Sequence, residues 1–217
     1  MASAVEICNR ALGRIGVDQF IEDFDDPNAR ARACRLHYEP CRDETLEDFP
    51  WNFAQSVVAL SLVADVEVPG WQYVYRYPAQ CAKVHRITDE AGNRVIRQNL
   101  TDVGIWNYDA LLPQKVPFAI MADPSTDGAR ILVTDLPDAY AWYTKRITDP
   151  SQFSAQFRSA LAWRIAAEVA LTLRADTRLY VNARDQFLWA VSQAQVASLM
   201  EEQPDRYPTS PSITARY

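Results

Sequence analysis

The sequence predicts a mixed α+β protein, in which helices from both ends of the chain form one bundle around a β-rich insertion. Helical periodicity with capping residues occupies residues 1–54 and 147–203, and strand-like alternation occupies residues 55–146. Residues 204–217 contain proline breaks and no period, which predicts an extended tail. We therefore expect two halves of a helical bundle, an inserted sandwich-like or barrel-like β domain, and a carboxy-terminal tail.

Capping residues predict the first two helices. Ser3 followed by Glu6 forms a capping box at the start of the first helix. Asp26-Pro27 has the cap-plus-proline order of a helix start and predicts a second helix, which ends before Pro50. On this second helix we expect Arg42 to lie on a solvated face, where neighbouring acidic residues balance its charge.

A third helix, which begins at Asp149-Pro150 by the same rule, is the centre of the predicted bundle. Between Ala160 and Leu173, eleven of fourteen residues are apolar, and the exceptions are Arg164, Glu168 and Thr172 at i, i+4 and i+8. These three residues form one polar thread along an otherwise apolar helix. Such a helix is either the core of the bundle or is shared with a neighbouring subunit. The polar interruptions argue against a membrane span of about 20 apolar residues.

Between the helices the pattern changes to that of strands. Four aromatic residues alternate from Trp71 to Tyr77 and share one face, which favours sheet packing over nucleobase stacking in an acidic chain. The segment Pro124–Gly128 predicts a hairpin turn, and Asp176 predicts the cap of a last helix. The expected strands are Val57–Val63, Trp71–Tyr77, Ala82–Ile87, Arg94–Gln98, Val116–Met121, Ala129–Val133 and Ala139–Arg146.

Composition and missing motifs exclude several classes of function. The chain has 217 residues and a net charge of −6, so it has no general electrostatic attraction to nucleic acid or to an anionic membrane. The first residues lack the basic and apolar regions of a secretory signal, so we expect the four cysteines to be reduced thiols in a cytosolic setting. No phosphate-binding glycine motif or nucleophile–base motif is recognisable. We therefore predict that the chain is not an enzyme and uses no cofactor.

The sharpest candidate for site chemistry is Cys34-x-x-His37-x-x-x-Cys41. These positions share one helix face, and Cys8 would supply a fourth ligand, so the pattern fits zinc. Against this, Pro40 distorts the helix between two of the residues, and cysteine packs in cores as a small apolar residue. We favour packing and predict no metal site. The alternative function is a small metal-binding or hydrolytic protein that uses Cys34, His37 and Cys41.

The polar thread of Arg164, Glu168 and Thr172 has two interpretations. In the first, it faces solvent and holds a weak ion pair between Arg164 and Glu168. In the second, it meets a partner subunit, because its flanks stay apolar where a solvated helix would be polar. We favour the partner-binding interpretation.

Several segments carry a resemblance when they are taken in order. The first segment is EICNRALGRIG, which contains Asn9-x-Ala11-Leu12. A long helix then leads into Pro50-Trp51-Asn52-Phe53-Ala54. The last two segments are WQYVYRYPAQCAKVHRI and YTKRITDPSQFSAQFRSALAWRIAAEVALTL. Over residues 3–200 this order resembles the head-to-tail adaptor proteins of tailed bacteriophages, the tail tubular protein A-like family. The strand–proline–strand segment departs from the family at Gln80, where an acid commonly follows Pro-Ala.

The resemblance implies a structural protein of the virion that is made in the host cytoplasm. It implies a dodecameric homo-oligomeric ring between the portal protein and a downstream tail or nozzle protein, through which genomic DNA passes without sequence-specific binding. No membrane is involved. The carboxy-terminal tails of such adaptors extend onto the portal, so Tyr207, Ile213 and Tyr217 are expected to bind there. The negative charge fits a channel that does not retain phosphates.

Overall fold

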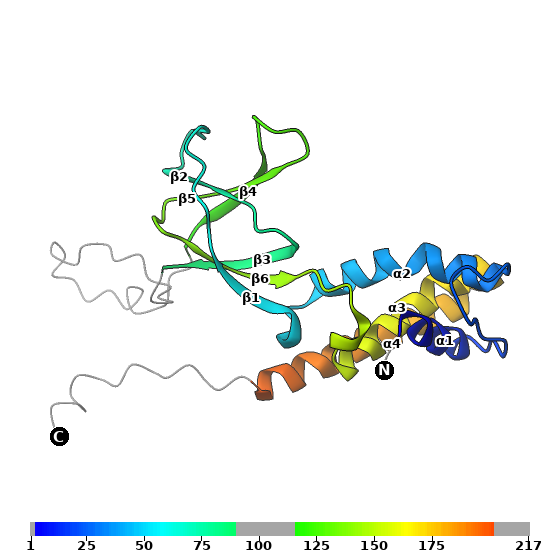
Figure 1. The fold of residues 1–217 in the computed structure, drawn as a ribbon. Coiled ribbons are helices and arrows are strands. Elements are labelled where there is room, and N and C mark those ends of the chain that lie inside the picture. The colour runs from blue at the N-terminus through cyan, green and yellow to red at the C-terminus, as the bar shows by residue number, and fades with distance from the viewer. Residues whose placement is uncertain (1–2, 90–115, 202–217) are drawn as a thin grey trace, which may run out of the picture.

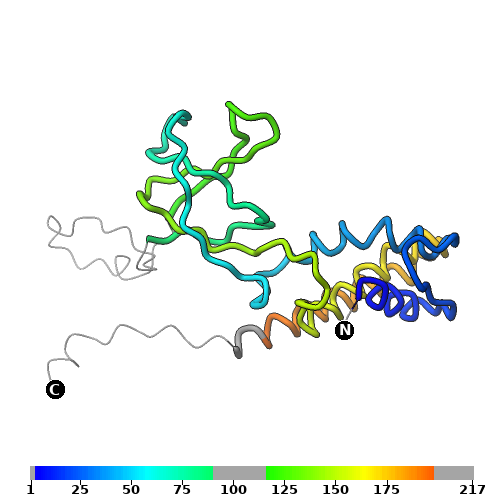
Figure 2. The backbone as a smooth tube through the Cα atoms, viewed as in Figure 1, coloured from blue at the N-terminus to red at the C-terminus, as the bar shows by residue number. Residues whose placement is uncertain are grey.

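The computed structural model describes residues 3–89 and 116–201 and has a mixed α+β architecture (Figure 1). This confirms the predicted class. Within these residues, four α-helices gather in one part of the molecule, and six strands form two three-stranded antiparallel sheets in another. Figure 2 follows the chain from helices at its blue start, through the strands, and back to helices at its orange end. The strand expected at Arg94–Gln98 and the tail at residues 204–217 lie outside the described residues.

The elements follow the predicted order along the chain. Two short 3-10 helices flank the strands, and the other elements are α-helices and β-strands. Their bounds are α1 (Ala4–Arg14), α2 (Ala29–Asp48), η1 (Asn52–Ala54), β1 (Gln55–Ala59), β2 (Tyr73–Arg76), β3 (Cys81–Thr88), β4 (Phe118–Ala122), β5 (Arg130–Thr134), β6 (Tyr140–Lys145), η3 (Pro150–Gln152), α3 (Ala155–Arg174) and α4 (Thr177–Glu201).

Local hydrogen bonds define both ends of α1. At its start the Ser3 hydroxyl accepts a hydrogen bond from the Glu6 amide at 3.0 Å, which confirms the predicted cap. Just past its end Gly16 has a φ of 70°, a left-handed conformation that glycine adopts without a Cβ penalty. The Val17 amide then donates to the Leu12 carbonyl at 3.1 Å. This bond satisfies a carbonyl of the last turn and ends the helix.

Helices α2 and α3 begin later than predicted. Asn28 caps α2 by accepting from a backbone amide at 2.8 Å, and Ser154 caps α3 in the same way at 3.2 Å. The two Asp-Pro dipeptides that were expected to begin these helices form the preceding turns instead. Asp26 of Asp26-Pro27 accepts from the Glu22 amide at 2.9 Å, and Asp149-Pro150 opens η3. The Asp-Pro order favours any turn with helical φ values, so it does not distinguish an isolated turn from a helix start.

Helix α3 is the common support of the helical part. It contacts α1, α2 and α4, and five of its nine buried residues are alanines. Small side chains let neighbouring helices approach closely. The buried alanines are Ala160, Ala162, Ala166, Ala167 and Ala170. One core thus joins residues 7–54 to residues 147–194. None of the helices in the described residues is long and apolar enough to cross a bilayer.

An aromatic cluster fastens the start of α3 to the end of α2. The ring of Phe157 lies 5.0 Å from Trp51, 5.2 Å from Phe53 and 4.7 Å from Phe153, measured between ring centroids. The Trp51 indole Nε1 also donates to the Thr45 carbonyl of α2 at 2.7 Å. The Pro-Trp-Asn-Phe-Ala segment therefore serves the packing of the helices.

The two sheets pack through a shared apolar core. Their strand orders are β1-β6-β3 and β2-β5-β4, and β4 pairs with β5 as the predicted hairpin. Tyr75 and Leu132 of the second sheet join Val84 and Tyr143 of the first sheet in one cluster. A smaller cluster around Val74 covers the other side of the second sheet. The strands therefore have cores of their own, separate from the core around α3.

The aromatic residues of β2 serve this packing, as expected. The rings of Tyr73 and Tyr75 stack with their centroids 6.3 Å apart, and the Tyr75 hydroxyl donates to the Leu136 carbonyl at 3.0 Å. Trp71 packs against the smaller cluster on the other side of the sheet, so the expectation that all four aromatic residues share one face was wrong for Trp71. The strand predicted at Val57–Val63 is shifted, since β1 ends at Ala59.

Two polar contacts join α2 to the end of the β region. Lys83 Nζ donates to the Glu47 carbonyl at 3.1 Å, and Arg146 forms an ion pair with Asp43. Arg42, which was expected to be solvated, is only 4% exposed and pairs with Asp43 at 2.9 Å. The expectation was wrong because β3 packs against α2 here. Periodicity within α2 does not reveal such a contact.

Truncation of Leu161 tests the core around α3. Leu161 is fully buried, so Leu161→Ala leaves a cavity and is expected to lower the free energy of unfolding by about 2–5 kcal/mol in urea denaturation. The matched control is Leu62→Ala, at a position 58% exposed, which should change this free energy by less than about 0.5 kcal/mol. Equal losses in the two variants would contradict the placement of α3 at the centre.

Candidate functional site

The polar thread of α3 faces α2 of the same chain. The Arg164 guanidinium forms ion pairs with Glu44 at 2.5 Å and with Asp48, both on α2. On the other side, the guanidinium carbon of Arg164 lies 5.1 Å from the ring centroid of Phe187 on α4. Arg164 therefore links three helices. Within the described residues, its ion pairs run between helices, in place of the pair with Glu168 that the solvent-facing interpretation assumed.

The far end of the thread also contacts α2. The Thr172 hydroxyl donates to the Glu168 carbonyl at 3.1 Å, and His37 Nε2 lies 2.9 Å from the same hydroxyl oxygen. Because the single hydroxyl hydrogen goes to the carbonyl, Nε2 of His37 must carry the hydrogen of the second bond. His37 is thus engaged as a donor between two helices.

The ion pairs of Arg164 contribute little to stability. Its side chain is 22% exposed, and those of Glu44 and Asp48 are 59% and 45% exposed, so solvent screens both attractions. Each such pair is worth about 0–1 kcal/mol. The value of these contacts lies in the orientation that they impose between α2 and α3. Partner binding by the thread stays a prediction, and any partner would meet side chains that already have contacts.

The cysteines of the proposed metal motif lie in the apolar core. Cys8, Cys34 and Cys41 are all buried in the cluster around α3. Burial raises the pKa of the Cys41 thiol to about 12, with a smaller opposing effect of Arg164. A hydrogen bond with Cys34 and burial together raise the pKa of Cys8. The same hydrogen bond lowers the pKa of Cys34, and burial opposes this effect. The thiols of Cys8 and Cys41 therefore stay protonated at neutral pH, which makes them weak nucleophiles and weak ligands.

The three residues of the motif do not form a ligand cluster. His37 is directed to the Thr172 hydroxyl, whereas Cys34 and Cys41 pack in the core. Across residues 3–89 and 116–201, no group of three or more His, Cys, Asp or Glu side chains is placed to hold a metal ion. The shared helix face that the spacing predicted is therefore a packing face in the structure.

The second histidine is also engaged. His85 Nε2 lies 2.7 Å from the Thr144 hydroxyl across β3 and β6. Burial, with smaller effects of Lys83 and Arg86, lowers the pKa of His85 below its usual value of 6.5. The imidazole is therefore neutral at pH 7, and it serves the sheet.

Sequence reasoning missed an exposed apolar face on α4. One face of this helix packs in the core, since Ala183, Phe187, Ala190 and Ala194 are buried. On the opposite face, four large apolar residues are exposed among polar ones such as Asp185 and Ser192. They are Val181, Leu188, Trp189 and Val196. One signal was available in the sequence, because no charged residue occurs from Gln186 to Met200. A solvated helix face is normally polar, so this face is the strongest candidate for an interaction surface.

The remaining partner-binding candidates lie outside the part of the chain that the structure describes. They are Tyr207, Ile213 and Tyr217. Among the described residues, two cavities of about 640 and 520 Å³ open beside the loop from Leu62 to Val74. Their linings contain no histidine or cysteine. The two cavities therefore lack the histidine base or cysteine nucleophile of a nucleophile–base catalytic site.

Thiol labelling tests the burial of the cysteines. In native protein at mildly alkaline pH, we expect a colorimetric disulfide reagent to label the thiols slowly, because burial keeps Cys41 protonated up to a pKa of about 12. In denaturant all four cysteines should react at once. Fast stoichiometric labelling of Cys34 or Cys41 in the native protein, located by peptide mass analysis, would contradict this account.

The chain matches no protein-family model, and no curated protein is similar to it at a significant level. The support for a function therefore comes from the residues and the geometry described above.

Proposed function

We propose that this chain is a structural, non-enzymatic head-to-tail adaptor of a tailed phage virion. In this proposal its copies form a dodecameric ring between the portal and the tail, and the genomic DNA passes through the ring. One observation carries the proposal: helices from both ends of the chain share a core around α3, while strands from the middle have separate cores. This is the layout that the family resemblance implies.

The same observation supports the finer domain division. Residues 1–54 and 147–203 are the two halves of a helical bundle, residues 55–146 are an inserted β domain, and residues 204–217 are a tail. The core of the helices contains residues 7–54 and 147–194, and the cores of the strands contain residues 66–143. Few polar contacts, such as that of Lys83 with Glu47, join the two parts.

The roles of the conspicuous side chains favour a scaffold. Trp51 and Phe53 hold α3 to α2, Arg164 and His37 bridge helices, and Cys34 fills the core. A protein that joins larger assemblies mechanically needs helices held in a fixed geometry, and it needs no reactive groups. The net charge of −6 suits a passage for DNA, since it disfavours retention of phosphates.

Binding to the portal tests the proposed function. The full chain is mixed with portal rings of the phage that encodes it, and the complexes are examined by native mass spectrometry and electron microscopy. We expect a ring of adaptor copies on one end of each portal ring. Portal rings that remain free at saturating adaptor concentration would overturn the proposal.

The tail provides a second test of portal docking. Replacing Tyr207, Ile213 and Tyr217 with serine is expected to abolish docking while the thermal midpoint stays unchanged, because these are the apolar anchors of the proposed tail contact. The matched control replaces Thr209, Ser210 and Ser212 with alanine and should dock normally. Docking of the serine variant at wild-type affinity would remove the tail from the interface.

A further inference from the structure

The outer face of α4 has the composition of an interface. Val181, Leu188 and Trp189 are 47%, 55% and 60% exposed, and the opposite face of the helix is packed on α3. Exposed apolar residues that occur singly need no explanation, but several on one helix face mark a binding surface. The absence of charge from Gln186 to Met200 adds to this, because no charged residue keeps that stretch solvated.

The amino-terminal half of the same face carries positive charge. Arg178 and Arg184 are exposed on α4, one on each side of Val181 in the sequence. Within the described residues, neither side chain has an ion-pair partner. Asp185 is exposed on this face as well, so the face combines apolar side chains with two arginines and one acid. A complementary surface would present an apolar side chain flanked by acids.

The loop between α1 and α2 presents such a surface. Phe20 is 59% exposed, and the carboxylates of Asp18 and Glu22 on either side of it are exposed as well. The side chain of Asn9 fixes this loop, since its Nδ2 donates to the Ile21 carbonyl at 2.8 Å and its Oδ1 accepts from the Ile21 amide at 2.9 Å. Ile21 is buried, and the ring of its exposed neighbour Phe20 lies beside Gly13 of α1. A loop fixed in advance loses little entropy on binding.

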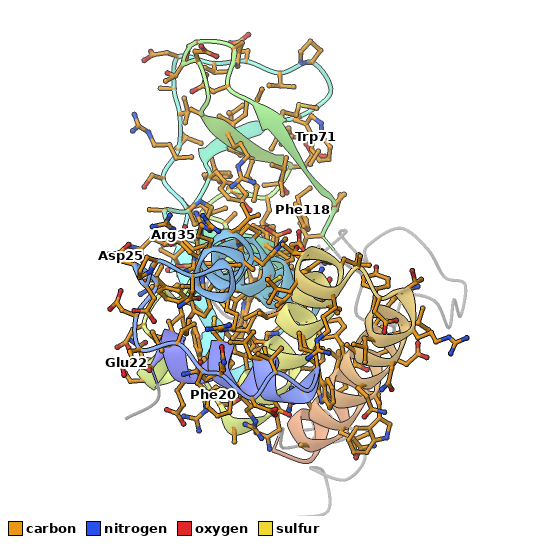
Figure 3. All side chains as sticks on the ribbon, turned by 90° about the vertical axis from the view of Figure 1, so that its right-hand side faces the viewer. Phe20, Glu22, Asp25, Arg35, Trp71 and Phe118 are labelled. Atoms are coloured by element: carbon orange, nitrogen blue, oxygen red, sulfur yellow. The ribbon has the colours of Figure 1, made fainter. Side chains whose placement is uncertain are left out.

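The two surfaces are separate parts of the helical region. In Figure 3, Glu22 and Asp25 are labelled on the left of the helices and Phe20 below them, and α4 lies at the lower right. Both surfaces are exposed in one copy, so its own loop does not cover its own α4. A contact between the two surfaces must connect different copies head to tail, which is the heterologous arrangement that closes into a ring when the rotation between copies allows it.

We infer that the Phe20 loop of one copy docks on the outer face of α4 of the next copy. Phe20 packs against Leu188 and Trp189, and Asp18 and Glu22 face the positive charges of Arg178 and Arg184. The inference rests on the proposed ring and names the surfaces that build it.

Mixing two variants tests this inference, because each variant lacks one of the two surfaces. Leu188→Asp removes the α4 surface and Phe20→Asp removes the loop surface. In sedimentation velocity at low salt and rising concentration, the wild type should self-associate, and each variant alone should stay monomeric. An equimolar mixture should form a dimer and nothing larger, since only one functional pair of surfaces remains. The matched control Leu62→Asp, at a position 58% exposed on the β region, should associate like the wild type.

Charge reversal provides a second measurement in variants that keep all apolar side chains. Asp18→Arg with Glu22→Arg should weaken association by about tenfold or more, and so should Arg178→Glu with Arg184→Glu. The variant with all four changes should regain association, because the charges are again opposite. The wild-type association should also weaken as salt is raised.

Three results would overturn the inference. One is a wild-type chain that stays monomeric at every concentration. Coverage of α4 by residues 202–217 of the same chain would give this result. Another is self-association of Phe20→Asp alone, which would mean that α4 pairs with α4. The third is a variant with all four charge changes that does not regain association.

These outcomes are independent of portal binding. Normal ring copy number on the portal with Leu188→Asp would refute the inference alone, and association without portal binding would refute the proposed function alone.

Discussion

Close packing of three helices on α3 is the constraint on which the rest of the structure depends. Alanines such as Ala162 and Ala166 are fully or almost fully buried where larger side chains would hold the neighbouring helices apart. Because α1 and α2 precede the strands and α3 and α4 follow them, this packing brings the two ends of the chain together. The strands must then leave the helical part and bury their apolar faces against each other.

The same packing decides which surfaces remain for partners. Helix α4 uses Phe187 and its neighbours to cover α3, and this turns Leu188 and Trp189 outward. The short connection from α1 to α2, fixed by Asn9, leaves Phe20 exposed on a separate surface. Two different apolar surfaces on one rigid helical unit are what a repeating head-to-tail assembly requires. The oriented ion pairs of Arg164 add rigidity to this unit and contribute little to net stability.

Sequence patterns predicted the helices and the hairpin, because these depend on contacts between residues that are near in the chain. They placed the caps of α2 and α3 too early, since Asn28 and Ser154 compete with the preceding Asp-Pro pairs. They also did not reveal that Arg164 faces α2, because its partners Glu44 and Asp48 lie 120 and 116 residues away. The candidate metal residues were chosen by chemical type, but burial in the core decides their properties. Conversely, Leu188 became a candidate only when the packed side of α4 was known.

Electron microscopy of intact virions tests the central claim most directly, because it places the chain in the assembly where it acts. The account predicts a ring of copies at the vertex where the portal meets the tail, with the Phe20 loop of each copy against α4 of its neighbour and the β region turned towards the tail. A particle that carries this chain elsewhere, or lacks it altogether, would contradict the account.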